Sequence, residues 1–436
     1  MTREACCKLT GVTYACCRWR GLIAAGLVAL GCGSGGAGSA DATAGAPGTD
    51  AGGGAGVGGG TAGVGGGSSG GVGGGGGGGV GVGGGSGGAV GSGGAGGMPI
   101  VVAPPSKWIN ATGNLAGMPS ECGNLTLVSA KPGSNVVIAG VAKAGLWANT
   151  DGGKAWGKLG SGAGSAVITN RTSAIVYDPD HPDVFWESGI YNGGGVYKTT
   201  DGGNTFQQQG SVTHNDSVSV DLGDPARKTM LAGPHEANHK LFRSTDAGAT
   251  WTDIGASLPA GTGFCTATLV LDAKTFLVGC NGGGGLGIFR STDGGIGWTT
   301  ASPKGGLAEP LVATDGTIYW PGSQGGLLKS TDKGVSFTEV ADGTTVPASV
   351  APVVIAQLPD KRIVLPGKDH LLASSDGGTT WKPIGEPLPF PGGGFDGTHG
   401  VTYSAQTKTF FVWKWDCGDQ VPVDAIMSAG FDYATQ

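Results

Sequence analysis

Two histidines are the residues whose types and spacing best suit acid–base chemistry. His214 lies in THNDSVSVD and His235 in GPHEANHK, and these segments are symmetric about Asp224-Pro225, a pair that predicts a tight turn. If the segments pair as a hairpin, the two imidazoles face each other across it. Asp216 and Glu236 accompany them. Because imidazoles titrate near pH 6.5, this group could share acid and base duties at neutral pH.

Two other uses of these side chains stay open. A metal site could form from His235, Glu236 and His239, but ligands spaced as in HExxH need a helix, and this loop leads into a strand. We therefore expect neither a metal nor a cofactor. A glycoside hydrolase would instead use two carboxylates, and the candidates are Asp216, Glu236, Glu309 and Glu187.

The elements that must position these residues form a repeat. Six segments match one another: NTDGGKAW, TTDGGNTF, STDAGATW, STDGGIGW, STDKGVSF and SSDGGTTW. Successive copies are 39 to 50 residues apart, a period that indicates a repeat architecture. Their aspartates are Asp151, Asp201, Asp246, Asp293, Asp332 and Asp376.

Each copy follows one short apolar strand and precedes another, so it closes a hairpin. Its hydroxyl and carboxylate groups can bind turn amides, and its glycine permits positive φ. The pattern resembles the Asp-box, or BNR, repeat of sialidases, sortilin-type receptors, xyloglucanases and photosystem assembly factors. That resemblance implies a β-propeller in which the six aspartates are structural. Calcium binding is the alternative, but the DxDxDG spacing is missing.

The predicted strands are enough for seven blades. Two further strands precede each copy, which makes four per unit. After the sixth copy come only GVTYSA, TFFVWKW and AIMSAGFDY, and residues 107–113 resemble the missing outer strand. We therefore predict an all-β fold, a seven-bladed β-propeller with four-stranded antiparallel blades, closed by its N-terminal strand. Six or eight blades are the alternatives.

Polar residues converge on one face of this propeller. The inner strands begin, and the second strands end, on the face opposite the six boxes, which we call the box-free face. Five of the six histidines map to it: His214, His235, His239, His370 and His399. We expect a ligand mouth there, although a wet, polar channel rim would look similar. The expected substrate contacts are Arg171, Glu187, Tyr191, Glu309, Trp320, Lys368, His399 and Trp415.

The histidine pair is similar to that of propeller-type polysaccharide lyases, ulvan lyases among them, which place two histidines on neighbouring strands of one blade. The resemblance implies that His214 or His235 removes a proton next to a uronate carboxylate, assisted by Tyr191 or the other histidine. Arg171 or Lys368 would neutralise the acid. Sialidase chemistry is disfavoured, because it needs three arginines and only Arg171 maps to this face. A non-catalytic glycan- or protein-binding propeller is the second class of function.

Four cysteines beyond residue 32 suggest two disulfides in an oxidising compartment. Cys265 and Cys280 are symmetric about a turn at Asp272-Ala273, so we predict that they are bonded. Cys122 begins the inner strand of blade 1 and Cys417 ends the second strand of blade 7. A bond between them would fasten the ring at its seam.

The N-terminal region predicts export. Residues 1–31 combine basic side chains with a nine-residue apolar run, typical of a signal peptide. The last residues of this region, followed by Cys32, resemble a bacterial lipobox, which implies lipidation of Cys32. Ordinary cleavage near Gly31 or Ala40 is the alternative.

Residues 32–98 are rich in Gly, Ser and Ala and predict a disordered tether, and residues 99–436 form the propeller. The net charge of −6 disfavours nucleic acid as a partner. We expect a monomer outside the cytoplasm, at the outer membrane or cell surface or otherwise periplasmic or secreted. It would bind polysaccharide or glycoconjugate and touch the membrane only through its lipid anchor.

Overall fold

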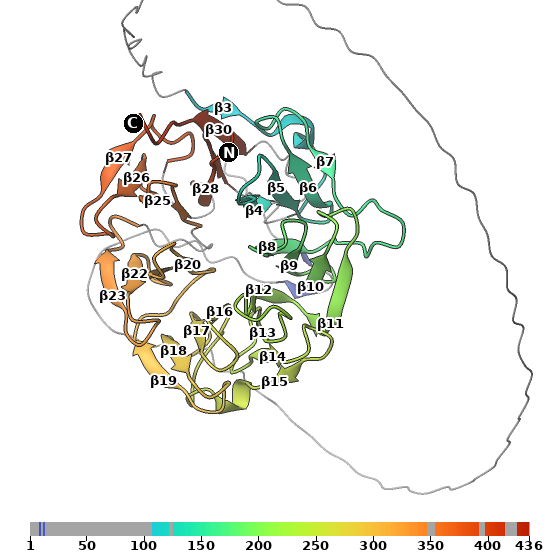
Figure 1. Cartoon of the computed structure of the whole chain (residues 1–436), viewed down its shortest axis with the longest axis vertical. Coiled ribbons are helices and arrows are strands. Elements are labelled where there is room, and N and C mark those ends of the chain that lie inside the picture. Colours follow the sequence, from blue (N-terminus) through green and yellow to red (C-terminus); the bar gives the residue numbers. More distant parts are fainter. Residues whose placement is uncertain are drawn as a thin grey trace, which may run out of the picture. The chain divides into compact units, whose positions relative to one another are not determined.

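The computed structural model describes residues 8–9, 12–13, 107–121, 125–346, 354–391, 397–414 and 425–435. Seven four-stranded antiparallel sheets follow one another around a ring (Figure 1), so the predicted seven-bladed propeller is confirmed. Four predictions lie outside the described residues: the tether, lipidation of Cys32, the Cys122–Cys417 bond and ligand contact by Trp415.

The first four blades each take their strands in chain order, from the inner strand to the outer one. The strands of blades 1 and 2 are β4 (Leu125–Ala130), β5 (Val137–Val141), β6 (Gly145–Asn149), β7 (Gly157–Lys158), β8 (Arg171–Tyr177), β9 (Phe185–Ile190), β10 (Gly195–Thr199) and β11 (Gln207–Thr213). Those of blades 3 and 4 are β12 (Asn215–Val220), β13 (Met230–Pro234), β14 (Phe242–Ser244), β15 (Thr252–Asp253), β16 (Ala267–Val270), β17 (Phe276–Cys280), β18 (Gly287–Ser291) and β19 (Thr299–Ser302).

Blades 5 and 6 repeat the order, whereas blade 7 takes its outer strand from the other end of the chain. These blades comprise β20 (Leu311–Val312), β21 (Ile318–Pro321), β22 (Leu327–Ser330), β23 (Thr338–Ala341), β24 (Ala356–Gln357), β25 (Ile363–Pro366), β26 (Leu371–Ser374), β27 (Lys382–Ile384), β28 (Gly400–Ser404), β29 (Thr409–Trp413), β30 (Ile426–Gly430) and β3 (Ile109–Asn110). Two 3-10 turns, η1 (Gly113–Leu115) and η2 (Gly255–Ser257), and a small sheet of β1 (Lys8–Leu9) and β2 (Val12–Thr13) complete the elements.

The hydrophobic core is divided among the blade interfaces. Seven buried clusters each join two neighbouring blades; Trp186 of blade 2, for example, packs with Met230 of blade 3. Each sheet therefore buries both faces against its neighbours, as a ring of sheets requires. No helix within the described part of the chain is long and apolar enough to cross a membrane.

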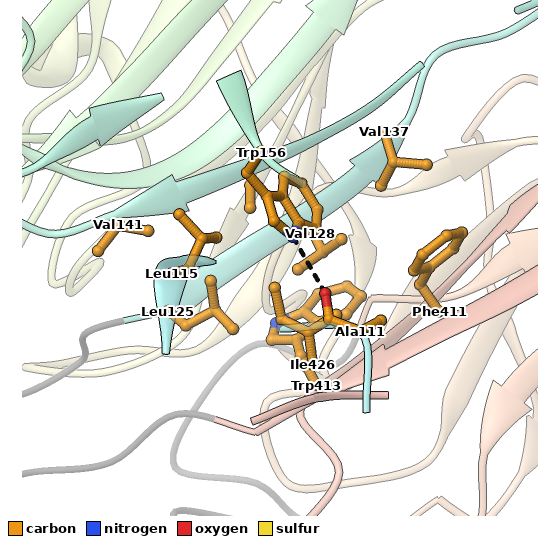
Figure 2. Close-up of a cluster of buried hydrophobic side chains, with 11 residues drawn as sticks. Ala111, Leu115, Leu125, Val128, Val137, Val141, Trp156, Phe411, Trp413 and Ile426 are labelled. Carbon is orange, nitrogen blue, oxygen red and sulfur yellow. Dashed lines mark hydrogen bonds between the residues drawn. The ribbon is translucent and has the colours of Figure 1, made fainter. Parts of the chain in front are cut away.

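The seam of the ring is closed by the N-terminal strand. Ile109 pairs with Ser428 and Asn110 with Met427, so β3 lies against β30 as predicted. The Trp156 indole nitrogen donates to the Ala111 carbonyl oxygen at 3.0 Å, within a cluster that combines residues from both ends of the propeller (Figure 2).

The six repeated segments close the hairpins between third and outer strands, and we call them box turns. In blade 3, Ser244 Oγ accepts a hydrogen bond from the Gly248 amide at 2.9 Å, and Asp246 Oδ1 accepts one from the Thr250 amide at 2.9 Å. Gly248 has φ of +87°, which glycine adopts without strain. Hydrogen bonds from Thr250 lower the pKa of Asp246 to about 2. The box turn is thus a ring of local hydrogen bonds that leaves the aspartate ionised.

A buried arginine joins blades 2 and 3 near their box turns. Arg227 donates from Nε to Asp178 Oδ2 at 3.0 Å and from Nη2 to Asp178 Oδ1 at 2.7 Å. A third bond runs from Nη2 to Asp180 Oδ2 at 2.6 Å. Since the Arg227 and Asp178 side chains are only 5% and 2% exposed, this fork links the two blades inside the protein.

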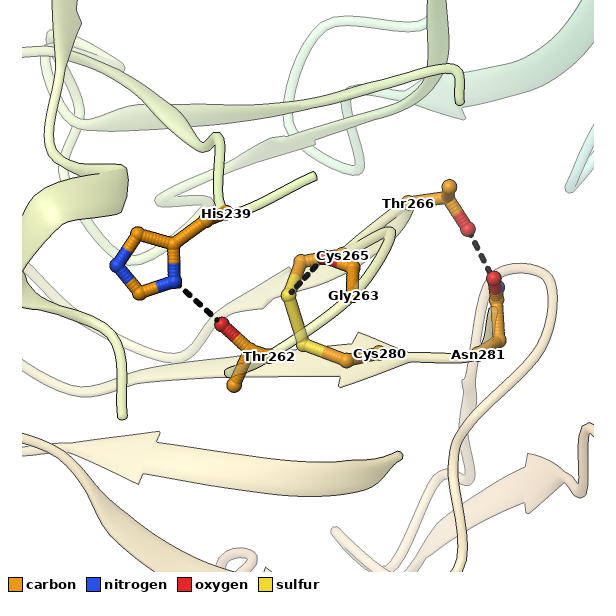
Figure 3. Close-up of a disulfide and its surroundings, with 7 residues drawn as sticks. All are labelled: His239, Thr262, Gly263, Cys265, Thr266, Cys280 and Asn281. Atoms are coloured by element: carbon orange, nitrogen blue, oxygen red, sulfur yellow. Dashed lines mark hydrogen bonds between the residues drawn. A yellow bond between two sulfur atoms is a disulfide. The ribbon is translucent and has the colours of Figure 1, made fainter. Parts of the chain in front are cut away.

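The predicted disulfide of blade 4 is confirmed. Cys265 and Cys280 are bonded across 15 residues, and both are fully buried at the box-free end of the two inner strands (Figure 3). The bond fixes the end of this hairpin, where Thr262 Oγ1 lies 2.8 Å from His239 Nδ1 of blade 3.

Candidate active site

Loops of blades 2 and 3 bring four of the predicted residues together. Tyr191 follows β9, His214 lies between β11 and β12, Asp216 is on β12, and His235 follows β13. All of these positions are at the box-free face, because they lie where a second strand ends or an inner strand begins. Asn215 pairs with Pro234, so His214 and His235 flank the end of one hairpin, as predicted.

Tyr191, His235 and Asp216 form a hydrogen-bonded chain, which we call the relay. His235 Nδ1 lies 2.8 Å from Asp216 Oδ2, and His235 Nε2 lies 2.9 Å from the Tyr191 hydroxyl. An ionised carboxylate can only accept, so Nδ1 carries the proton. In neutral His235 the other nitrogen, Nε2, must then accept from the tyrosine hydroxyl. The relay is thus a hydroxyl, an imidazole base and a carboxylate that orients it.

The neutral His214 ring is held in the opposite tautomer. Its Nδ1 accepts a hydrogen bond from the Tyr191 backbone amide at 2.9 Å. The neutral ring must therefore carry its proton on Nε2. His214 can donate a hydrogen bond from Nε2, but it has no nitrogen left to act as a base.

The aromatic rings of the site pack edge to face. The ring centroids of His214 and His235 are 4.9 Å apart, and that of Tyr191 lies 4.8 Å from His214 and 5.2 Å from His235. The Arg171 guanidinium carbon lies 4.7 Å from the centre of the Tyr191 ring. A cation in this position favours negative charge on the phenol.

Burial and charge separate the pKa values of the two histidines. Burial and then the proximity of His235 lower the pKa of His214. Burial alone would also lower the pKa of His235, but the hydrogen bond and charge of Asp216 outweigh it and the pKa is raised. Burial, with the charge of Glu236, raises the pKa of Tyr191, so its hydroxyl keeps its proton in the resting state.

The backbone of these loops is held in an unfavourable conformation. The φ angles of Tyr191, Asn192, His214 and Glu236 are 56°, 44°, 62° and 49°. Bulky side chains rarely adopt the left-handed region, and strain of this kind concentrates at functional sites. Tyr191 and His214 therefore take their positions at an energetic cost that the surrounding contacts offset.

Three further predicted contacts lie on the surface or apart from the relay. The Glu236 side chain is 64% exposed, and its Oε1 is 3.7 Å from His235 Nε2. Lys368 is exposed in the turn between β25 and β26, on the opposite side of the ring. Burial raises the pKa of Glu309, in the connection from blade 4 to blade 5, to about 8.

Three predicted substrate contacts are wrong. Trp320 is fully buried, where its ring packs between blades 4 and 5 and its nitrogen donates to the Ala308 carbonyl at 3.0 Å. His399 is 1% exposed against Trp413, and burial lowers its pKa to about 3. Glu187 is fully buried, which raises its pKa to about 8. Glu187 and Trp320 lie on second strands and His399 precedes β28, but all three side chains are buried inside the propeller.

The alternative metal set is not assembled. His239 Nδ1 lies 2.8 Å from Thr262 Oγ1 of the neighbouring blade, while both nitrogens of His235 are engaged in the relay. Within the residues that the structure describes, no three histidine, cysteine or acidic side chains are arranged to hold a metal ion.

Two residues of the site were missed in the sequence. Asn192 follows Tyr191, and its side-chain amide donates to Glu121 Oε1 at the start of blade 1. The signal was present as Tyr-Asn-Gly-Gly, because Asn-Gly marks a tight turn with positive φ. Nothing in the sequence places Glu121 beside it.

A pocket also lies away from the relay, between blade 1 and the chain leading into blade 2. Its lining is mainly apolar and includes Leu146, Leu159 and Phe206, with Lys158 at its edge. Because it offers one ionisable side chain and the relay offers several, we place the chemistry at the relay.

The chain is similar to a curated enzyme in sequence and to solved structures in fold. No protein-family model matches the chain. A curated xyloglucanase from a Paenibacillus species is 26% identical over 293 residues, which cover 53% of this chain and 28% of that protein. The chain therefore spans much less than half the length of this relative.

Two solved GH74 structures are similar to this chain. The GH74 enzyme of Niastella koreensis superposes with a TM-score of 0.51 at 16% identity, covering 72% of this chain and 53% of that chain. The GH74 xyloglucanase from Xanthomonas campestris gives 0.49 at 17% identity, covering 74% and 53%. This chain thus spans about half of each enzyme, and at such identity the likeness concerns the propeller fold.

Proposed function

We propose that this propeller acts on an extracellular polysaccharide, and that the relay is its acid–base centre. The relay itself carries the proposal, because the hydroxyl of Tyr191 is bonded to an imidazole that Asp216 orients. The similarity to a xyloglucanase supports a polysaccharide as the substrate class. Export on residues 1–31, lipidation at Cys32, a tether over residues 32–98, Asp-box identity of the repeats and a monomeric state belong to the same proposal.

The reaction that this geometry supports best is β-elimination next to a uronate carboxylate. Tyr191 passes its proton to His235, and the phenolate oxygen removes the proton next to the carboxylate. The electron pair forms a carbon–carbon double bond as the glycosidic carbon–oxygen bond breaks. Tyr191 gives the abstracted proton to the leaving oxygen and recovers its own from His235, so charge and protons balance.

The neighbouring residues assist without exchanging protons. Arg171 stabilises the transient phenolate, whose ring it faces at 4.7 Å. His214 offers Nε2–H to a substrate oxygen, since its Nδ1 is occupied. Lys368 is excluded from this role by its place across the ring.

The test is to incubate the full chain with uronate-containing and with neutral polysaccharides. Unsaturated product is followed by its ultraviolet absorbance, and new chain ends by a reducing-sugar assay. We expect both signals from a uronate polymer, and a loss of about 100-fold or more in Tyr191→Phe and His235→Ala. His239→Ala is the matched control, because this imidazole lies in the same loop but bonds Thr262.

Hydrolysis is the second candidate, favoured by the match to a xyloglucanase. Asp216 and Glu236 both approach His235 and would supply the acid and base. Reducing ends without absorbance would establish this reaction and overturn elimination. Retained glycan binding without any product would instead identify a binding module.

A further inference from the structure

The loop that carries Tyr191 is held by residues outside the relay. The Asn192 side-chain amide donates to Glu121 Oε1, and Thr169 Oγ1 donates to the Asn192 carbonyl at 2.5 Å. On its other side, Glu121 Oε2 pairs with Lys143 Nζ at 3.0 Å. The Glu121 carboxylate therefore links Lys143 to the turn that carries Tyr191.

These contacts connect blade 1 to blade 2. Glu121 precedes β4, and Lys143 lies in the turn between β5 and β6. The Lys143 amide donates to the Thr169 carbonyl at 3.0 Å, which ties the same turn to the connection before β8. Together with the relay, the contacts form a continuous path across three blades.

We propose that Glu121 is a positioning residue, which holds Asn192 in its left-handed turn and thereby keeps the Tyr191 hydroxyl on His235. Its catalytic consequence rests on the proposed function, but its effect on the position of Tyr191 does not. No role for Glu121 in contacting substrate is implied.

The backbone explains why this loop needs support. Tyr191 and Asn192 are consecutive residues with positive φ, and a bulky side chain such as tyrosine is strained there. Without the contact to Glu121, the turn can relax, and a displacement of about 1 Å is enough to cost a catalytic group most of its effect. An exposed ion pair contributes little to stability, so the role of Glu121 concerns geometry.

The first test follows the His235 imidazole of the full chain by nuclear magnetic resonance as pH is varied. In Glu121→Ala we expect its pKa to rise by about 0.5 unit, because Tyr191 no longer shields the ring from water. Loss of the Glu121 charge alone would shift the pKa downward, so the sign separates the two causes. Glu121→Gln keeps an acceptor for Asn192 and should stay near the parent value.

Adding Asn192→Gly to Glu121→Ala checks the cause, because glycine adopts positive φ without support and should bring the His235 pKa back toward the parent value. Lys408→Ala, in an exposed ion pair with Asp432 of blade 7, is the remote control. An unchanged or lowered His235 pKa in folded Glu121→Ala would overturn the proposal.

The second test uses the uronate polymer of the elimination assay. In Glu121→Ala, kcat should fall about 10- to 100-fold with KM changed less than about threefold, and Glu121→Gln should recover most of the rate. A rise in KM alone would show that Glu121 contacts substrate and would overturn the positioning role. If the parent chain gives no elimination product, the proposed function fails, and the titration alone decides the role of Glu121.

Discussion

His214 and His235 are neighbours in one cluster, yet their pKa values move in opposite directions. The difference comes from Asp216, which contacts Nδ1 of His235 at 2.8 Å, whereas Nδ1 of His214 faces a backbone amide. As pH falls, the cluster therefore takes up its first proton on His235, while His214 stays neutral. The proposed elimination uses the neutral form of His235, which predominates above its raised pKa.

We predict that Asp216→Asn reverses the shift of His235. Without the Asp216 carboxylate, burial is the largest remaining effect and outweighs the charge of Glu236, so the pKa of His235 should fall below the ordinary 6.5. In the parent, a raised pKa contributes stability below about pH 6.5 that is lost as pH rises through the folded value. The free energy of unfolding should thus differ more between variant and parent at pH 5.5 than at pH 9. Histidine titrations and urea unfolding at both pH values measure this, and an unchanged pKa would contradict it.

The pairing of His214 with His235 could be predicted because hairpin symmetry fixes which residues meet. The bond between Tyr191 and His235 could not, since it joins different blades through a left-handed turn. The side chains of Trp320, His399 and Glu187 were misplaced for a related reason. A position near the end of a strand fixes the face of the propeller but does not fix whether the side chain points to the rim or into a blade interface.

At the scale of the elements, blades 2 and 3 are joined by the two hydrogen bonds from Arg227 to Asp178. Losing this pair should lower the free energy of unfolding. In Arg227→Ala the Asp178 carboxylate would stay buried without its partner, and the hydrogen bonds that now lower its pKa would be gone. We expect a loss of about 3–5 kcal/mol in the free energy of unfolding. The exposed pair of Lys408 and Asp432 is the control, and Lys408→Ala should change the free energy of unfolding far less than Arg227→Ala. Equal effects in urea unfolding would show that the fork contributes no more than a surface pair.

The disulfide of blade 4 offers a second element-scale prediction. Replacing both cysteines, as Cys265→Ala/Cys280→Ala, should lower the free energy of unfolding by about 3 kcal/mol, because the bond closes a loop of about 15 residues in the unfolded chain. The parent unfolded in excess reductant should match the double variant. A parent whose unfolding is insensitive to reductant would contradict this role.

The order of the strands was predictable because each box turn marks the hairpin between the third and outer strands of a blade. After the sixth box turn, three strands remain at the C-terminus without an outer strand. The short outer strands carry much less signal: β3, β7 and β15 have two residues each. The spacing of the box turns predicted where these strands lie. Two residues are too few to show the alternation of polar and apolar side chains that marks a strand.

At the scale of the whole molecule, closure depends on residues 107–118. These residues supply β3 and bury Ala111 and Leu115 in the cluster between blades 7 and 1. A chain that starts at residue 119 should therefore melt at least about 10 °C lower than one that starts at residue 107.

A circular permutant supplies the control. Residues 107–118, attached through a flexible linker after residue 435, should restore the melting temperature, because β3 lies beside β30. If the shortened chain melted like the longer one, the seam would not depend on this strand.

The pairing of β3 with β30 also fixes the order of events during synthesis. Ile109 leaves the ribosome more than 300 residues before its partner Ser428, so blade 7 and its two interfaces stay open until β30 has been synthesised. Contacts of such long separation form slowly, and an open sheet edge invites association with other chains. Blade 7 is therefore the last to form, and until then blades 1 and 6 each keep one side exposed where the two ends of the propeller will meet.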